Sequence, residues 1–570
     1  MSGRRRFLSK AIDPLIALLL GAGYVWLLLS TVKNLGYARD EGFYFQAAKS
    51  YGAWFDLLTT HPRQALEQIT VDRYWSANHE HPALMKSLFA LSHKYLYRHW
   101  HWFPEEGTSM RFAGMVVSSL AVSTTYLWGQ KAIGRLGGLV AAVLLAMMPR
   151  VFFHSHLDCF DMPVAAMWLV TTYAYWRSLE RGGWAWPIAT GILYGLLLDT
   201  KHNSWLLPFA LIAHLVITRG GKLWRDLRAG RIPVPSALFA MATIGPAVFY
   251  MGWPWIWHDT GKRLAAYVAF HMGHVYYNME FLGHTYWKPP MPLGYPWLMT
   301  LATVPGITLL LFGVGLVASL LYAYGGKLGE LGRRIGIEPH ARDPRRYSND
   351  VLWALSILIS YAPWLSHHTP IFGGTKHWIT AYPFMCLFAA RGFSLTLDRL
   401  RALGRARFGP GFVRTRATEV VLGASVLAAP IAITLHSHPW GLSAYTPLVG
   451  GAPGAATLGL NRTFWGYTTG AEAGYLDQHV PRNGSLFLHD TAMQSWDMLR
   501  ADGRVRSDIR PTLNIEASGT ALYHHEPHME RVEYQVWVDY GTDAPVHMGV
   551  YDGVPVIWIF ARPLPAGGGG

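Results

Sequence analysis

Long apolar segments separated by short polar loops run through the first three quarters of the chain. Segments of about 18 residues are long enough to cross a hydrocarbon core of about 30 Å, so this pattern predicts membrane-spanning helices. The segments at 184–199 and 203–218 are short and are also compatible with one re-entrant pair. We expect about eleven helices, near residues 14–32, 109–128, 137–153, 162–177, 184–199, 203–218, 234–253, 295–323, 351–366, 377–397 and 419–436.

The loops between these segments alternate in charge. One set, at 1–13, 129–136, 177–183, 219–232, 324–350 and 399–418, holds 25 Lys and Arg residues. The opposite set, near 150–161, 199–202, 254–293 and 366–376, holds 6. Because basic loops stay in the cytoplasm, we expect a cytoplasmic N-terminus and an external, in a bacterium periplasmic, C-terminal region. The first apolar segment is longer than that of a signal peptide, so we expect it to be retained as an anchor.

Two regions outside the apolar segments have the patterns of folded structure. In the first external loop, 33–108, apolar and aromatic residues recur at helical spacing over 43–58 and 84–97. Such amphipathic helices lie either in the membrane interface or on the protein's own surface. Residues 438–570 lack any further spanning segment and predict a small soluble α/β domain beside a membrane domain at 1–437. Its expected elements are helices at 471–478 and 491–500 and strands at 485–488, 534–538 and 555–560.

Composition supports a polytopic α-helical membrane protein. The chain has 570 residues, of which 51% are hydrophobic and only 15% are charged, against about 25% charged in soluble proteins. The net charge of +14 is explained by basic loops that face the anionic cytoplasmic leaflet, so nucleic acid is not an expected partner. Cys159 and Cys386 are the only cysteines, which argues against a disulfide framework or a cysteine metal site.

Polar motifs gather on the predicted external side. Asp40 and Glu41 directly follow the first apolar segment, where keeping an acidic pair close to hydrocarbon is costly. The other motifs are 78–86 (NHEHPALMK), 154–163 (HSHLDCFDMP), 199–202 (DTKH) and 373–378 (GGTKHW). A carboxylate can serve as a general base, and lysines beside the bilayer can bind a phosphate and stabilise its charge as it leaves. This combination indicates group transfer from a phosphorylated lipid.

The order of these motifs resembles the protein O-mannosyltransferase and lipid A aminoarabinose transferase superfamily. The likeness covers roughly residues 10–400 and consists of Asp-Glu after the first helix, a His-Pro-x-Leu-x-Lys-like motif, an Asp-x-Pro turn and a Lys-His turn. It implies the glycosyltransferase-C fold and a polyprenyl-phosphate-sugar donor. It also implies an inverting transfer to an external acceptor, which is a glycan, a lipid or a protein. The sequence departs from the family pattern at 80–83, where a second proline is usual.

The resemblance also implies roles for individual residues. Asp40 matches the catalytic base, with Glu41 beside it. The second acidic position matches Asp158 or Asp161, and Asp158 is preferred because Asp161 precedes Met-Pro at a helix start and can serve as a cap. The donor phosphate and sugar are assigned to residues of the external motifs: Lys86, Lys201, His202, His81 and Lys376.

Other interpretations stay open at this point. The Asp40–Glu41 pair can cap the helix that follows it, and Lys86 can extend from an interfacial helix to the headgroups. External histidines and acidic residues can supply a zinc or manganese site, but no HExxH-type spacing supports one, so we expect that no metal is required. A lipid-linked sugar transporter or flippase would place ionisable residues deep in several helices. A non-catalytic envelope assembly subunit would tolerate loss of Asp40.

Overall fold

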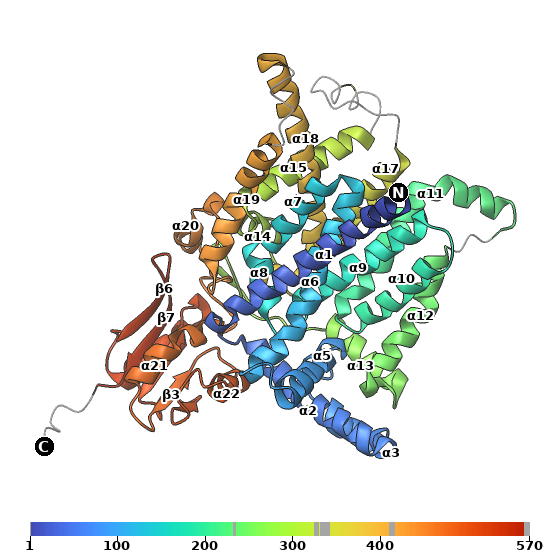
Figure 1. Ribbon diagram of the computed structural model, residues 1–570. Helices are drawn as coiled ribbons and strands as arrows, with labels where there is room; N and C mark the ends of the chain where they lie inside the picture. The colour runs from blue at the N-terminus through green and yellow to red at the C-terminus, as the bar shows by residue number, and fades with distance from the viewer. Residues whose placement is uncertain (1, 232–234, 324–329, 331–342, 410–416, 564–570) are drawn as a thin grey trace, which may run out of the picture.

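The computed structural model describes residues 2–231, 235–323, 330, 343–409 and 417–563, and the predicted basic loops at 324–350 and 399–418 lie partly outside them. Long helices form the larger part of the molecule, and one β-sheet lies at its C-terminal end (Figure 1). The long helices and their shorter partners are α1 (Ser2–Thr31), α6 (Glu106–Ala132), α7 (Arg135–Ala146), α8 (Pro149–His156), α9 (Asp161–Glu180), α10 (Ala185–Leu198), α11 (Leu207–Arg228), α12 (Ser236–Gly252), α14 (Tyr295–Thr303), α15 (Gly306–Ala323), α17 (Pro344–Tyr361), α18 (Tyr382–Phe408) and α19 (Ala417–Ser437).

Every predicted apolar segment coincides with helix, but two segments are interrupted. The segment at 137–153 is divided into α7 and α8, which are bent by 68° relative to each other. The segment at 295–323 was expected to be one helix, and this is wrong, because it is divided into α14 and α15. A proline stands at each break, Pro149 and Pro305. Proline lacks the N–H that a continuing helix needs, and so each break begins a new helix.

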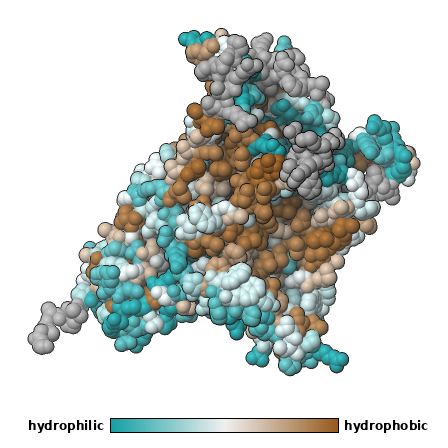
Figure 2. Space-filling view, viewed as in Figure 1, coloured by the Kyte–Doolittle hydropathy of each residue, from teal (hydrophilic) through white to brown (hydrophobic). Residues whose placement is uncertain are grey.

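The protein is a membrane protein with at least five candidate spans. Among the described residues, these are Ala11–Asn34, Glu106–Ala132, His202–Arg228, Gly306–Ala323 and Thr418–Ser437, with the bent pair Arg135–His156 as a sixth. The expected number of about eleven is not confirmed; α10 and α12, for example, have only 14 and 17 residues. Apolar side chains gather over the helical part of the surface (Figure 2). On α1, Leu18 and Trp26 are 67% and 71% exposed, as expected for side chains that face lipid.

The segment 33–108, predicted to be the first external loop, folds into several helices. They are α2 (Arg39–Thr60), α3 (Pro62–Ala65), α4 (Gln68–Trp75), α5 (Leu84–Ser92) and a π-helical turn at His93–His99. Both predicted amphipathic helices are confirmed. On α2, Tyr51 and Trp54 pack against Trp75 of α4, with ring centroids 3.9 and 5.1 Å apart. These aromatic residues therefore form a core of the protein itself, because they are almost completely buried.

A second segment that was predicted to be external follows α12. It contains α13 (Thr260–Met272) and a hairpin of β1 (Met279–Phe281) and β2 (His284–Tyr286), which pair antiparallel. His258 at the start of the segment hydrogen-bonds to the carbonyl of Leu66, 3.1 Å away. His271 on α13 makes a 2.9 Å hydrogen bond to the carbonyl of Glu80. Hydrogen bonds thus hold this segment against the segment 33–108.

The C-terminal region, residues 438–563, contains a five-stranded mixed sheet. Its order is β4–β3–β5–β7–β6, with β3 parallel to both β4 and β5 and β7 antiparallel to both β5 and β6. Helices cover this sheet, and α20 (Gly451–Thr457) precedes them. The bounds are β3 (Ser485–Leu488), β4 (Arg510–Thr512), β5 (Thr520–His524), β6 (His547–Tyr551), β7 (Val554–Ala561), α21 (Ala473–His479), α22 (Met493–Ala501) and α23 (Glu530–Tyr540).

The sequence pattern predicted four of these elements. The strands at 485–488 and 555–560 and the helices at 471–478 and 491–500 are confirmed within a few residues. The predicted strand at 534–538 is wrong, because this segment lies in α23. Val536 and Tyr540, four residues apart, are both buried against the sheet. The period of this short segment was therefore that of a helix with one buried face.

The C-terminal region packs on the start of α2. The hydroxyl of Ser495 on α22 donates a 2.9 Å hydrogen bond to the carbonyl of Ala38. The backbone N–H of Arg39 donates a 2.7 Å hydrogen bond to the carbonyl of Trp465. A β-carbon at Gly42 would lie only 2.8 Å from the backbone nitrogen of Ser495. Glycine at position 42 therefore permits the close approach of α22 to α2.

Candidate active site

A cavity of about 760 Å³ lies where the first turn of α2 meets the turns after α10 and before α18 and the C-terminal region. This volume is in the range of about 300–1,000 Å³ that is usual for small-molecule sites. Among the predicted site residues, those that line it are Asp40, His81, Lys201, His202 and Lys376. Those that are buried outside its lining are Glu41, Lys86 and Asp158.

Two ion pairs lie at the centre of the cavity wall. Lys376 Nζ is 3.5 Å from Asp40 Oδ2, and Lys201 Nζ is 2.5 Å from Asp161 Oδ1. The Asp40 side chain retains 25% exposure, whereas the Lys376 side chain retains 7%. Lys376 also lies over the ring of Trp465, 3.9 Å from its centroid. The partly exposed carboxylate of Asp40 thus lies beside the ammonium group of Lys376, which packs on the ring of Trp465.

The local backbone explains why Lys376 points at Asp40. Lys376 belongs to the 3₁₀ turn Gly374–His377, and the glycines at 373 and 374 have φ of 73° and 63°. Only glycine adopts this left-handed conformation without strain. The turn lets the chain reverse just before α18, which directs the lysine into the cavity. The motif GGTKHW is thus a sharp turn that carries a cation.

The charges of the two pairs affect each other. Burial raises the pKa of Asp161, but Lys201 and Lys376 outweigh burial and hold the pKa below its usual value. Burial lowers the pKa of Lys376, and Asp40 and Asp161 counteract this in part. The four side chains therefore form one electrostatic group, in which two cations are balanced by two carboxylates. An incoming phosphate would find two lysines within one small volume.

Histidines form another part of the wall. The rings of His202 and His271 are stacked with centroids 3.9 Å apart, and His81 lies 5.5 Å from His271. Burial lowers the pKa of His81 well below its usual value and that of His271 to about 4. These two rings are therefore neutral near pH 7 and offer hydrogen bonds without adding charge. Among the residues that the structure describes, no group of three or more His, Cys, Asp or Glu side chains is arranged to hold a metal ion.

Glu41 is the centre of a buried network directly beside Asp40. Its carboxylate accepts hydrogen bonds from Arg111 Nε and Nη2, both at 2.7 Å, and from the backbone N–H groups of Ala38 and Asp158, both at 2.8 Å. Glu41 and Arg111 are both completely buried. Arg111 also donates to the carbonyls of Leu35 and Gly36, at 3.0 and 2.6 Å. This network fixes the backbone on both sides of Asp40.

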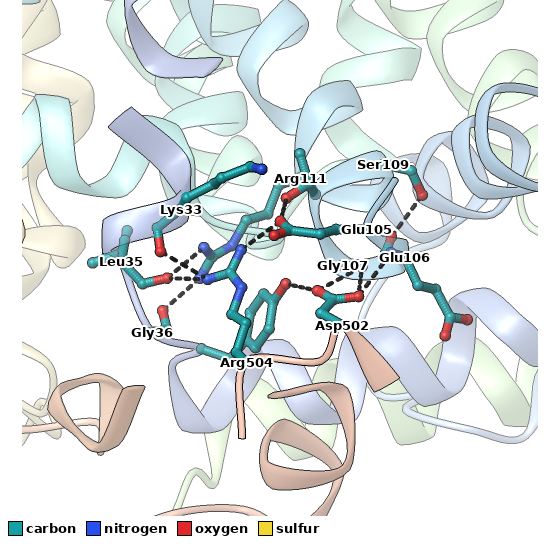
Figure 3. A network of polar contacts seen from close by, with 12 residues as sticks. Lys33, Leu35, Gly36, Glu105, Glu106, Gly107, Ser109, Arg111, Asp502 and Arg504 are labelled. Atoms are coloured by element: carbon teal, nitrogen blue, oxygen red, sulfur yellow. Dashed lines mark hydrogen bonds and ion pairs between the residues drawn. The ribbon is translucent and has the colours of Figure 1, made fainter. Parts of the chain in front are cut away.

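The C-terminal region reaches the same network (Figure 3). Arg504 donates to the carbonyl of Leu35 at 3.0 Å and to Glu105 at 2.8 Å. Asp502 accepts hydrogen bonds from the hydroxyl of Tyr37 and, at 2.7 Å, from the backbone N–H of Glu106. A carboxylate at the first turn of a helix accepts hydrogen bonds from free N–H groups, and the helix dipole stabilises its negative charge. Asp502 therefore caps α6 from a position almost 400 residues later in the chain.

Lys86 and Asp158 have surroundings different from those expected of ligand-binding residues. Lys86 Nζ donates to the carbonyls of Asn78 and His81, at 2.5 and 2.9 Å, and burial lowers its pKa to about 7. Lys86 thereby fixes the turn that carries His81. Burial raises the pKa of Asp158, whose carboxylate oxygens have no hydrogen-bond partner among the described residues. The acidic residue of this turn that lines the cavity is Asp161, whereas Asp158 had been preferred.

The sequence motifs do not include Arg111, Asp490 or Glu526. Arg111 carries the network around Glu41, and Asp490 and Glu526 of the C-terminal region line the cavity. No local motif marks them. The only available pattern is that Asp490 and Glu526 each follow a strand by two residues.

Comparison with known proteins supports the class that the site suggests. Residues 101–250, about a quarter of the chain, match the family model described as dolichyl-phosphate-mannose-protein mannosyltransferase. The matched part includes Asp161 and Lys201. This confirms the resemblance to polyprenyl-phosphate-sugar-dependent glycosyltransferases that the motifs indicated. A search of curated proteins gave no significant match.

Solved structures of similar overall architecture have low sequence identity to this chain. ArnT from Cupriavidus metallidurans bound to undecaprenyl phosphate is 12% identical, with a TM-score of 0.44 and coverage of 95% of this chain and 97% of that one. The oligosaccharyltransferase AglB from Archaeoglobus fulgidus is 11% identical, with a TM-score of 0.46 and coverage of 92% and 71%. The arabinofuranosyltransferase AftD from Mycobacteria is 12% identical, with a TM-score of 0.40 and coverage of 96% and 40%.

Proposed function

We propose that the protein is a membrane glycosyltransferase that moves one sugar, with inversion, from a polyprenyl-phosphate donor to an external acceptor. The observation that carries this proposal is the pair formed by Asp40 and Lys376 in the wall of the cavity. A base for the acceptor and a cation for the leaving phosphate stand 3.5 Å apart. The family-model match over 101–250 supports the same class of donor.

In this proposal Asp40 accepts the proton of the acceptor hydroxyl or amine. The acceptor atom forms a bond to the anomeric carbon while the bond from that carbon to the phosphate oxygen breaks. The leaving polyprenyl phosphate takes the electron pair, and Lys376 and Lys201 stabilise its charge. A single displacement of this kind inverts the anomeric configuration.

The remaining predicted residues take supporting roles. Asp161 holds Lys201 in position and is the second acidic residue of the site, in place of Asp158. Glu41 positions Asp40 through the Arg111 network, and Lys86 positions the turn that carries His81. His81 and His202 contact the sugar or the phosphate through neutral rings. We propose that no metal ion is required, because the lysines supply the positive charge that the leaving group needs.

We also propose an orientation, supported by the loop charges. The N-terminus is cytoplasmic, and residues 438–570 form an external domain, in a bacterium a periplasmic one. Both native cysteines are buried, so single introduced cysteines report cleanly on exposure. A membrane-impermeant maleimide added to intact cells should label Glu516→Cys and leave Arg231→Cys unlabelled. The reverse pattern would refute this orientation.

The function is tested with purified protein in liposomes. Radiolabelled polyprenyl-phosphate sugars are supplied as donors, with the mannose donor first because of the matched family. Envelope extracts are supplied as acceptors. The assay follows the label that moves from the lipid into water-soluble products. We expect release of polyprenyl phosphate and appearance of a glycoside of inverted anomeric configuration by NMR. If every donor stays intact while undecaprenyl phosphate binds, a transporter or assembly role would replace the enzyme.

A further inference from the structure

The C-terminal region contributes two carboxylates to the cavity wall. Asp490 and Glu526 follow β3 and β5, each two residues after the strand ends. The two strands are parallel neighbours, so their carboxyl ends meet at one edge of the sheet. On its other side β3 pairs with β4, and on its other side β5 pairs with β7. A crevice at the carboxyl ends of parallel strands is where open α/β sheets bind ligands.

This sheet edge is tied to the proposed catalytic base. Asp490 Oδ1 accepts a 2.7 Å ion-paired hydrogen bond from Arg39, the residue directly before Asp40. Arg39, Asp40, Asp490 and Glu526 all line the same cavity. A molecule bound at this edge therefore lies on the side of Asp40 that belongs to the C-terminal region. The lysines come from other elements, the turn after α10 and the turn before α18.

Glu526 has an oxygen without a partner. Its side chain is 7% exposed, and no hydrogen-bond donor among the described residues reaches Oε1. Burial and the neighbouring Asp490 carboxylate raise the pKa of Glu526 well above its usual value. Oε2 lies 3.2 Å from His528 Nε2, and His528 Nδ1 lies 3.0 Å from Glu280. An unpaired oxygen in a buried carboxylate costs free energy unless a ligand supplies a donor. Because Glu526 lines the cavity, its unpaired oxygen indicates a ligand that donates hydrogen bonds.

The neighbouring side chains indicate what kind of ligand this is. Tyr277 lines the cavity with 49% exposure, and Asn278 beside it lies 3.2 Å from His528 through its amide. An exposed aromatic ring, an amide and carboxylates are the groups that suit a sugar, which has an apolar face and adjacent hydroxyls. Arg39 already balances Asp490, and His528 stands between Glu526 and Glu280. The Arg39 guanidinium in this wall therefore weakens the case for an amine.

We infer that the wall formed by Asp490 and Glu526 is the acceptor site, and that it takes a neutral sugar residue of a glycan. Glu526 and Asp490 accept hydrogen bonds from neighbouring hydroxyls of that sugar, and Tyr277 packs on its apolar face. The inference rests on the proposed function, because it names the acceptor of the same transfer. It assigns donor binding and acceptor binding to separate residues.

The test measures sugar binding without transfer. Full-length protein in detergent is titrated with mannotetraose, arabinotetraose and, as a cationic probe, tetralysine, and binding is followed by saturation-transfer NMR. We expect at least one oligosaccharide to bind saturably and Glu526→Gln to weaken it about tenfold, the effect of losing one buried hydrogen bond. The matched control is Glu516→Gln, an exposed carboxylate on the same region, which should bind as the wild type does.

Undecaprenyl phosphate is titrated into the same samples, so the two proposals can fail separately. Glu526→Gln should bind this lipid normally, whereas Lys376→Met should lose the lipid and keep the oligosaccharide. Equal oligosaccharide binding by wild type and Glu526→Gln would overturn the acceptor site, as would the absence of oligosaccharide binding. Tighter binding of tetralysine that depends on Glu526 would overturn the sugar class. If the wild-type protein does not bind undecaprenyl phosphate, this result would instead count against the proposed function.

Discussion

The ion pair between Glu41 and Arg111 offers a quantitative test of how the base is held. Replacing Arg111 with Met removes two hydrogen bonds to the Glu41 carboxylate, each 2.7 Å long, and leaves that carboxylate completely buried without its cation. Two hydrogen bonds to a charged group contribute about 3–6 kcal/mol. Breaking a buried ion pair costs about 3–5 kcal/mol. Both estimates therefore predict a loss of about 3–5 kcal/mol in the free energy of unfolding.

The assay is unfolding of purified protein in mixed micelles by titration with sodium dodecyl sulfate, followed by circular dichroism. Arg135→Met is the control, because its pair with Asp13 leaves the arginine 51% exposed and should contribute little to the free energy of unfolding. Adding Glu41→Gln to Arg111→Met should restore part of the loss, since the unpaired charge is then gone. A loss below about 1 kcal/mol for Arg111→Met, or purely additive effects, would refute the reasoning.

Two further predictions concern the lysines. Lys376→Met and Lys201→Met should each raise the donor KM about tenfold, as expected for loss of a charged phosphate contact. The acceptor KM should stay constant, and unchanged donor kinetics in both variants would remove the phosphate-binding assignment. For Lys86, burial lowers the pKa to about 7 from 10.5, so between these values the unfolded chain binds more protons and stability rises with pH. Thermal melts from pH 6.5 to 9.5 should show this rise in the wild type and lose it in Lys86→Met; an equal slope in both would contradict it.

Patterns that repeat along the chain were readable from the sequence. The apolar segments, the amphipathic helices of the first loop and two strands of the sheet depend on local periodicity, which side chains reveal directly. The segment 534–538 was misread because five residues are too few to separate a helical period from an alternating one. The break at Pro305 was missed because the surrounding apolar run is continuous.

The site was predictable only as far as local motifs reach. Asp40, Lys201 and Lys376 belong to separate local motifs, and the structure brings them to one cavity. Asp158 and Asp161 lie in the same turn, and only the backbone path decides which of the two faces that cavity. Lys86 turns back to the carbonyls of its own loop, which spacing does not reveal.

Contacts over long distances in sequence left no trace in any motif. Arg111 pairs with a residue 70 positions earlier, and Asp502 caps a helix 396 positions earlier. The first contact forms when α6 packs on α2, and the second forms when the C-terminal region packs on the start of α6. The wall formed by Asp490 and Glu526 also depends on contacts that are distant in sequence, because β3 and β5 must first become neighbours in the sheet.

The most direct test of the account is sugar transfer by Asp40→Asn. This variant keeps the size of the side chain and removes the base, and size-exclusion chromatography with undecaprenyl phosphate binding confirms that it is folded. With polyprenyl-phosphate sugar and acceptor both saturating, we predict that the transfer rate falls by about 10²–10⁴, the usual contribution of a general base. A folded Asp40→Asn protein that transfers sugar at the wild-type rate would contradict the central claim.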